Sequence, residues 1–523
     1  MRIRLIAAVF ILTTLAVCSA SAASFIVPSD RELTSKAEAV VIATAQTSVS
    51  RVNARGGIET VTSFRIEEVL KGTIEQSDPL EVITLGGSLG STSLIVPDSP
   101  RFSAGERSLL FLSRKRSGSW TTVDMILGKF NFVRDDKQQK LLLRSNEIFG
   151  WNRDGVRHVE PFRDEARFLR FVRHVARGEA FEADYFLEAA GISSGPAASE
   201  KTTSELTAAD FGLLDERGAV SRYLRFDSAT PDAVRWVSRG SQPGFADSVR
   251  SLRRALEAWT TEPLSNALYE YTTTATTGTF SACDNQFTAL FDDPEKEIEG
   301  TFRGSGTLAV GGFCVSASHP FGGQPFGTIS DADLVVQDGV GSFVSLGLFE
   351  EILTHEFGHT LGIRHSDEAG RLPNTQLAIM NSTINGHPSY GTTLQQFDRQ
   401  AVQFLYPIAT GGGGSCTGLC LIGNRFDATL VARDERTGNT GTGSPLPQSD
   451  IFGYFSIPAL TNNATNPEVF VKVLDAGGRF WVFYGGLTDF EFTLSIRDTR
   501  TGAVKTYFKA AGSLCGGADT NAF

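Results

Sequence analysis

Residues His355 to Ser366 read H-E-F-G-H-T-L-G-I-R-H-S. On a helix, His355 and His359 lie about one turn apart on the same face, so both imidazoles can reach one ion. Gly362 lets the chain turn out of the helix, because glycine adopts positive φ without penalty, and the turn returns His365 as a third ligand. In catalytic sites Zn²⁺ usually keeps three protein ligands and a water. The stretch therefore predicts one Zn²⁺ bound by His355, His359 and His365.

Glu356 directly follows the first histidine, where its carboxylate can reach a water at the metal rather than the metal itself. This position suits a general base. The alternative is an amphipathic core helix that contains histidines by chance. The chain has seven histidines in 523 residues, and three of them stand at the ligand positions, which favours the metal site. Apolar residues at helical spacing precede the motif and predict that it lies on a helix: Leu346, Phe349, Ile352 and Leu353.

A second motif, A-I-M-N-S at Ala378 to Ser382, follows downstream. With the histidine motif it resembles the metzincin zinc peptidases, and Ser366 after the third histidine is similar to the matrixins among them. The resemblance implies that Met380 forms a tight turn beneath the metal-binding imidazoles. An ordinary core methionine is the alternative reading. Residues 394–406, L-Q-Q-F-D-R-Q-A-V-Q-F-L-Y, resemble the C-terminal helix of the matrixin catalytic domain.

The resemblance implies a central α+β metzincin catalytic domain over residues 223–410. Pro231 to Val237 reads as a strand and Ala246 to Thr260 as a helix with one apolar face, which is how such domains begin. Ile329 to Asp338 is similar to the edge strand above the cleft, where an open edge would hold an extended peptide by main-chain hydrogen bonds. Pro388 to Tyr390 is similar to the wall of the S1′ pocket.

Three acidic residues near that strand, Asp331, Asp333 and Asp338, are candidate Ca²⁺ ligands, because Ca²⁺ prefers several oxygen ligands. The alternative is a solvated face of the strand.

The N-terminus carries the pattern of a secretory signal peptide, which we place at residues 1–23. Two arginines precede the apolar run Leu5 to Val17, and Ala20-Ser21-Ala22 offers a small-residue cleavage site. Cys18 leaves lipidation as an alternative. We therefore expect a secreted, extracellular protein, and the later sequence contains no apolar run long enough for a membrane span.

The cysteines agree with an oxidising compartment. Cys283 and Cys314 fall within the predicted catalytic domain, where a disulfide between them is plausible. Cys416, Cys420 and Cys515 lie in the C-terminal segment, so one of these three is left unpaired or joins another chain. No cysteine lies between residues 19 and 282, so a thiolate from that region cannot block the zinc.

Strand-like runs flank the predicted catalytic domain on both sides. Residues 24–150 predict an all-β, barrel-like domain, and residues 151–222 an amphipathic helix followed by a linker. After the glycine run Gly411 to Gly414, residues 415–523 alternate apolar and polar side chains and predict an all-β, sandwich-like module. This module resembles a β module that recurs at the ends of secreted bacterial proteins. Its aromatics at residues 480–484 read as a sandwich core, with a carbohydrate platform as the alternative.

These observations together predict a secreted zinc-dependent endopeptidase that acts on proteins or peptides, with Glu356 as catalytic base. One alternative is a protein whose metal site is structural. The other is a surface or glycan-binding protein in which the β modules carry the function, with extracellular matrix or cell-surface glycans as partners. The net charge of −11 argues against nucleic acid as a partner.

Overall fold

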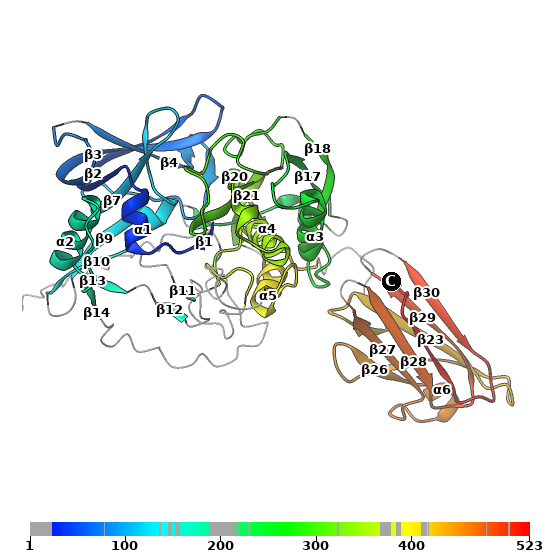
Figure 1. The fold of residues 1–523 in the computed structure, drawn as a ribbon. Coiled ribbons are helices and arrows are strands. Elements are labelled where there is room, and N and C mark those ends of the chain that lie inside the picture. The colour runs from blue at the N-terminus through cyan, green and yellow to red at the C-terminus, as the bar shows by residue number, and fades with distance from the viewer. Residues whose placement is uncertain are drawn as a thin grey trace, which may run out of the picture.

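The structure of the chain is a computed structural model. It describes residues 23–77, 79–134, 138–144, 149–151, 157–159, 161–187, 211, 213, 215–216, 219–228, 231–275, 277–321, 324–366, 378–382, 389–408, 416, 418–476, 479–499 and 503–523. Most of the predicted signal peptide, the predicted linker and the glycine run lie outside these residues. Among the described residues, no helix is both long and apolar enough to cross a membrane. The protein is multidomain and mostly β (Figure 1).

The N-terminal region is built on a nine-stranded sheet in the order β14-β13-β10-β9-β7-β2-β3-β4-β8. Strand β8 pairs with both β4 and β7, so β7, β2, β3, β4 and β8 form a closed ring. The strands are β2 (Ala39–Val52), β3 (Ile58–Lys71), β4 (Leu80–Leu85), β7 (Arg107–Arg114), β8 (Trp120–Thr122), β9 (Lys129–Arg134), β10 (Lys140–Leu143), β13 (Phe162–Asp164) and β14 (Phe186–Leu187). Helices α1 (Asp30–Lys36) and α2 (Glu165–Ala176) pack against each other beside the ring. A separate hairpin pairs β11 (Phe149–Trp151) with β12 (Arg157–Val159).

The central region is a mixed sheet in the order β18-β17-β19-β21-β20. Its strands are β17 (Val234–Arg239), β18 (Tyr269–Thr274), β19 (Thr288–Leu290), β20 (Gly306–Phe321) and β21 (Gln324–Val336). All neighbouring pairs are parallel except β20 with β21, which form an antiparallel hairpin. Helices α3 (Ser248–Thr260) and α4 (Leu346–Thr360) pack against each other beside this sheet, and α5 (Gln396–Leu405) completes the core (Figure 1).

The prediction that Ile329 to Asp338 forms an edge strand was wrong. Ile329 to Asp338 lies mostly in β21, which is paired on both sides, by β19 and by β20. Of the five central strands, β20 is the outer one on the side of the N-terminal region, and β18 is the outer one on the other side. Alternation of side chains shows which residues form a strand, but it does not show which strands become its neighbours, because pairing is decided by distant parts of the chain.

The outer edge of β20 is itself covered by strands from the N-terminal region. Strand β6 (Thr92–Ile95) pairs with it and also forms a hairpin with β5 (Gly87–Leu89). Strand β1 (Ala23–Ile26) pairs antiparallel with the first half of β20. One apolar cluster draws side chains from both regions: Phe25, Ile58, Leu94, Val96, Met125, Leu127, Phe280, Leu290, Ile298, Val310, Cys314 and Val335. The N-terminal region and the central region therefore share buried apolar surface.

Residues before position 223 also reach the central core. Phe211 and Leu213 are buried in it, although the sequence analysis places them in the linker. Strand β16 (Ala219–Arg222) pairs in parallel with β21 and forms a hairpin with β15 (Asp215–Glu216). A 3-10 turn, η4 (Leu224–Phe226), then leads to β17.

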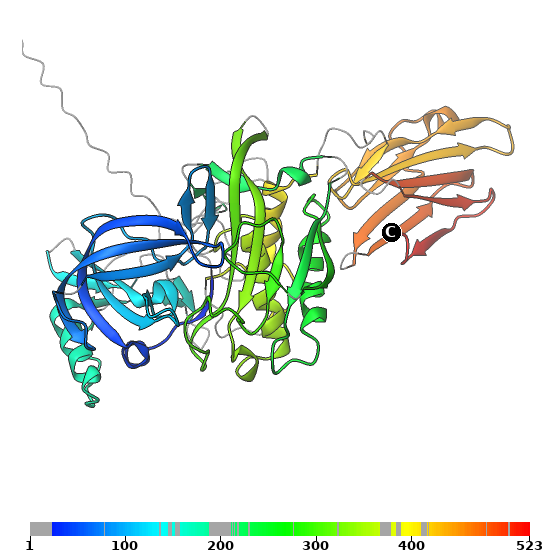
Figure 2. The same cartoon turned by 90° about the horizontal axis from the view of Figure 1, so that it is seen from above.

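The C-terminal residues form two five-stranded sheets around a core of their own (Figure 2). One sheet contains β22 (Leu419–Leu421), β23 (Phe426–Arg433), β24 (Thr440–Thr442), β29 (Glu491–Asp498) and β30 (Val504–Lys509). The other contains β25 (Ser444–Pro447), β26 (Phe452–Ser456), β27 (Val469–Asp475), β28 (Phe480–Gly486) and β31 (Gly516–Asp519), with the short helix α6 (Pro458–Thr461) after β26. Phe480 is buried in the core between them, whereas Trp481 is partly exposed.

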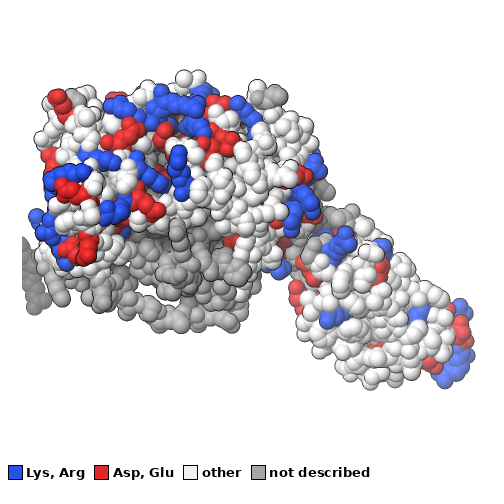
Figure 3. Space-filling model, viewed as in Figure 1, with Lys and Arg blue, Asp and Glu red and all other residues white. Residues whose placement is uncertain are grey.

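The structure contains a disulfide between Cys283 and Cys314, the pair proposed from the sequence. A second disulfide joins Cys416 to Cys420, and Cys515 is free and exposed. Charged residues of both signs are interspersed over the N-terminal region on the face drawn in Figure 3.

Candidate metal centre

Helix α4 carries the first two histidines. Ser345 caps its start by accepting a hydrogen bond from the Leu348 N–H, at 3.2 Å. Every residue from Phe349 to Thr360 is buried, so the helix runs through the middle of the core. A helix buried on all sides is usually apolar all round, so the polar residues that α4 contains need specific partners.

Helix α4 ends at Thr360, two residues before Gly362, where the chain turns away. Gly362 has φ +93°, a conformation that L residues rarely adopt. A side chain here is excluded by space as well, because an added Cβ would lie 2.5 Å from the Ser221 carbonyl oxygen. The turn that follows brings His365 back toward His355 and His359.

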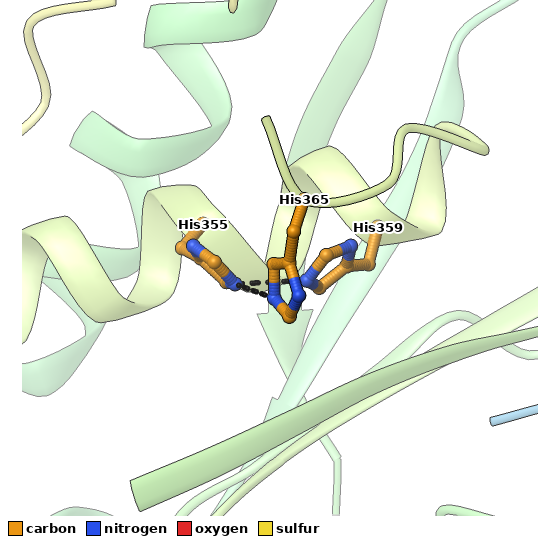
Figure 4. Close-up of side chains that lie close together, drawn as sticks. All are labelled: His355, His359 and His365. Carbon is orange, nitrogen blue, oxygen red and sulfur yellow. Dashed lines mark hydrogen bonds between the residues drawn. The ribbon is translucent and has the colours of Figure 1, made fainter. Parts of the chain in front are cut away.

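The three imidazoles converge on one point (Figure 4). The Nε2 of His355 lies 2.8 Å from that of His359 and 3.1 Å from that of His365. Zn–N distances of about 2.0–2.1 Å in a tetrahedral site would place ligand nitrogens roughly 3.3 Å apart. All three side chains are fully buried. The cluster fits a zinc site, and among the described residues it is the one group of three or more metal-binding side chains that gathers in this way.

Hydrogen bonds to backbone carbonyls fix the orientation of two rings. The Nδ1 of His355 lies 2.7 Å from the Ile379 carbonyl oxygen, and the Nδ1 of His359 lies 2.8 Å from that of Ile363. A carbonyl oxygen can only accept, so each Nδ1 carries the proton and each Nε2 keeps its lone pair for a metal.

Burial also favours the neutral form of the histidines. It lowers the pKa of His355 to about 4. The pKa values of His359 and His365 are also lowered, first by burial and then by the neighbouring histidines. Neutral imidazole is the form that binds metal.

Met380 lies in a turn against the face of α4 between the two histidines. A Cβ added to Gly358 would come within 2.2 Å of the Met380 Sδ. The Ser366 N–H donates to the Met380 carbonyl at 2.7 Å, which ties the turn to the segment after the third histidine. The methionine is fully buried.

Asp398 on α5, which was not among the predicted site residues, holds the Met380 turn in place. Its carboxylate accepts the N–H groups of Ile379 and Met380 at 2.9 and 3.0 Å. Burial raises the pKa of Asp398 to about 6, although these hydrogen bonds oppose the shift. The sequence feature that could have pointed to Asp398 is its place as an acidic residue among the apolar positions in the first turn of an amphipathic helix. Its carboxylate binds backbone N–H groups there.

Glu356 is fully buried, and both of its carboxylate oxygens are occupied. Oε2 accepts the Gly311 N–H of β20 at 2.6 Å. Oε1 accepts the N–H of Ser24 at 3.0 Å and its hydroxyl at 2.6 Å. Burial raises the pKa of Glu356 to about 8, with the hydrogen bonds acting in the opposite direction. No sequence motif pointed to a role for Ser24 or Gly311 at this site.

The three candidate calcium ligands contact groups of the chain itself. Asp331 accepts the Asp284 N–H at 2.8 Å, and Asp333 accepts the Thr288 N–H at 3.0 Å. Asp338 pairs with Lys296 at 2.9 Å. Calcium at this place stays a prediction.

The segment compared with the S1′ wall contacts α4. Ser389 Oγ and the Tyr390 N–H donate to Glu351 Oε2 at 2.8 and 2.9 Å. Pro388 lies outside the described residues.

A family model described as dual-action HEIGH metallo-peptidase matches residues 301–378. The match supports a zinc metallopeptidase. It spans β20, β21, α4 and the three histidines, and His355 to His359 reads H-E-F-G-H. No curated protein matches the chain. The implied zinc agrees with the buried histidine cluster, and a peptidase implies protein or peptide substrates.

Proposed function

We propose that this chain is a secreted zinc endopeptidase of the matrixin type, with Glu356 as general base. The observation that carries the proposal is the convergence of three buried imidazoles on one point, where the Nε2 of His355 lies 2.8 Å from that of His359 and 3.1 Å from that of His365. Ser366 after the third histidine and Met380 in its turn support the matrixin subtype. The N-terminal pattern and the disulfide between Cys283 and Cys314 support secretion.

His355, His359 and His365 would hold the ion. Zn²⁺ bound there supplies a Lewis acid for the scissile carbonyl and a water activated near neutral pH. The chain contributes the rest. The carbonyls of Ile379 and Ile363 keep two imidazoles in the ligand tautomer. Glu356 accepts a proton from the attacking water at its carboxylate and then passes it to the leaving amine.

Glu356→Gln tests the proposal. The amide keeps the shape of the side chain but cannot accept the proton, so kcat on a casein-derived peptide should fall by at least ~100-fold. Zinc content by elemental analysis should stay at one ion per chain. Glu257→Gln, at an exposed position on α3, is the matched control and should cleave at the wild-type rate. Near wild-type kcat in Glu356→Gln would refute the assigned base.

A chelator provides the second arm of the experiment. Removing the metal should abolish cleavage, and adding back one equivalent of Zn²⁺ should restore it. Cleavage that survives chelation, with zinc absent by elemental analysis, would contradict a zinc mechanism.

A further inference from the structure

The outer edge of β20, where an extended peptide could be added to the central sheet, is occupied by the chain itself. Strand β1 pairs antiparallel with residues 306–310 of β20, and β6 pairs with residues 313–315. Gly311 lies between these two ladders, and its N–H is used by Glu356. An extended peptide binds by pairing with an open strand edge, and this edge is closed along residues 306–315.

Strand β1 also reaches the proposed catalytic base. Ser24, 332 positions before Glu356, donates both its N–H and its hydroxyl to Oε1. The other oxygen of the carboxylate accepts from Gly311. Hydrogen bonds to a buried carboxylate are among the stronger ones in proteins. In this arrangement both oxygens of Glu356 are engaged by the chain's own groups rather than left for a water.

Strand β1 is held in place by the side chain of Phe25 and by the helix that follows the strand. The Phe25 side chain is buried in the apolar cluster shared by the two regions, with Leu94 and Val310 among its members. Four residues after Phe25, Ser29 caps α1, which begins at Asp30. Asp30 at the start of that helix forms buried ion pairs with two arginines of the N-terminal region: Arg144 and Arg163. The segment is therefore held by packing and charge, not by its backbone pairing alone.

From these contacts we infer that residues 23–27 act as a built-in inhibitor of the catalytic cleft. They fill the strand edge and engage Glu356, and the N-terminal region keeps them there. Cleavage of a peptide then requires β1 to leave β20. The inference rests on the proposed function, since it concerns access to the same site. The inhibitory contacts come from a serine and a strand, not from a cysteine thiolate. This agrees with the lack of a cysteine between residues 19 and 282.

Phe25→Asp in the full chain tests this directly, because a carboxylate cannot stay in the apolar cluster and should release β1. The control is Val49→Asp, which places the same charge on an exposed position of β2. Mass spectrometry should first verify the N-terminal residue of each purified protein, and elemental analysis should verify one zinc per chain. A second variant, which lacks residues 23–27, removes the strand outright.

Two readouts are expected to change together. Hydrogen exchange of the backbone amides in residues 306–310 should speed up at least 10-fold in Phe25→Asp and in the deletion, and stay unchanged in Val49→Asp. The kcat/KM for a short fluorogenic peptide should rise at least 10-fold in the same two variants. A synthetic peptide with the sequence of residues 23–28, Ala-Ser-Phe-Ile-Val-Pro, should reduce that activity again.

The outcomes separate this inference from the proposed function. Faster exchange with kcat/KM equal to that of an active wild type would overturn the inhibitory role and leave the peptidase proposal intact. Faster exchange with no cleavage in any zinc-loaded variant would overturn the peptidase proposal and the inference with it. Unchanged kcat/KM in the deletion variant overturns the inference whatever Phe25→Asp does. In Phe25→Asp/Glu356→Gln the gained activity should disappear, which ties it to this site.

Discussion

Gly358 and Met380 are in direct contact across the metal centre: a Cβ added to Gly358 would lie 2.2 Å from the methionine sulfur. The same Cβ would meet Trp259 Cζ2 at 2.8 Å. Gly358 thus leaves the space in α4 that the Met380 turn and the Trp259 ring occupy. Gly358 stands between His355 and His359 in α4. The distance between α4 and the Met380 turn therefore also affects where the two imidazoles lie.

Gly358→Ala should therefore destabilise the protein, although alanine is the better helix former by up to ~1 kcal/mol. Overpacking of a filled core costs about 1–3 kcal/mol and outweighs that gain. Thermal unfolding of the zinc-loaded protein should show a lower Tm. The matched control is Gly347→Ala in the first turn of the same helix, where the nearest atom to an added Cβ is the Ser389 Oγ, at 3.3 Å. A Tm for Gly358→Ala at or above wild type would contradict the contact.

Loss of one imidazole should empty the metal site. In His359→Ala two ligands remain, and a catalytic zinc site usually needs three, so elemental analysis should show zinc largely lost after dialysis. His174→Ala removes a partly exposed histidine that stacks on Phe181 in the N-terminal region, and it should keep one zinc per chain. Zinc at wild-type stoichiometry in His359→Ala would show that the main site lies elsewhere.

Asp293 should make stability fall as pH rises from about 4 to 7. It is fully buried and accepts the N–H groups of Glu297 and Ile298, both at 2.9 Å. Burial raises its pKa to about 7. The folded state therefore binds a proton that the unfolded state has released in this window, so the contribution of this group to stability is full below pH 4 and is lost toward pH 7.

The measurement compares urea unfolding of wild type and Asp293→Asn at several values between pH 4.5 and 7.5. The difference between the two free energies of unfolding should change by up to about 1.4 kcal/mol per pH unit, the value for one proton. Asp232→Asn removes an exposed carboxylate and controls for the lost charge. A pH-independent difference for Asp293→Asn would show that the carboxyl titrates in the ordinary range.

Truncation after Pro407 should leave the chemistry intact. The C-terminal sheets have their own apolar core, to which the central region contributes the partly buried Leu264. The proposed ligands, the base and the turn all precede residue 407. The shortened chain, in a form with β1 released, should cleave a short peptide at close to the rate of the matching full chain. Residues 416–523 expressed alone should unfold cooperatively on heating. Loss of zinc from the truncated chain would mean that the module completes the catalytic fold.

Much of the metal centre could be predicted from the sequence because its geometry is local. His355 and His359 are one helical turn apart, and Gly362 and His365 follow within six residues, so helix periodicity and one glycine place all three ligands. Helix α4 was predicted for the same reason, since its apolar residues repeat within a few positions, whereas α5 was implied by the resemblance of residues 394–406 to a matrixin helix. The small number of cysteines left few possible disulfide pairings, and the pairing of Cys283 with Cys314 was one of them.

Only the tertiary structure decided which strand forms the outer edge and what covers it. β20 rather than β21 is the outer strand, and β1 pairs with it from the far end of the chain. Asp398 supports the Met380 turn, and Ser24 meets Glu356 across 332 positions. Strand pairing joins residues at any separation, and a side-chain pattern of period two is satisfied by many partners. The sequence by itself thus determined which residues could hold a zinc ion, whereas long-range packing decided whether a peptide can reach them.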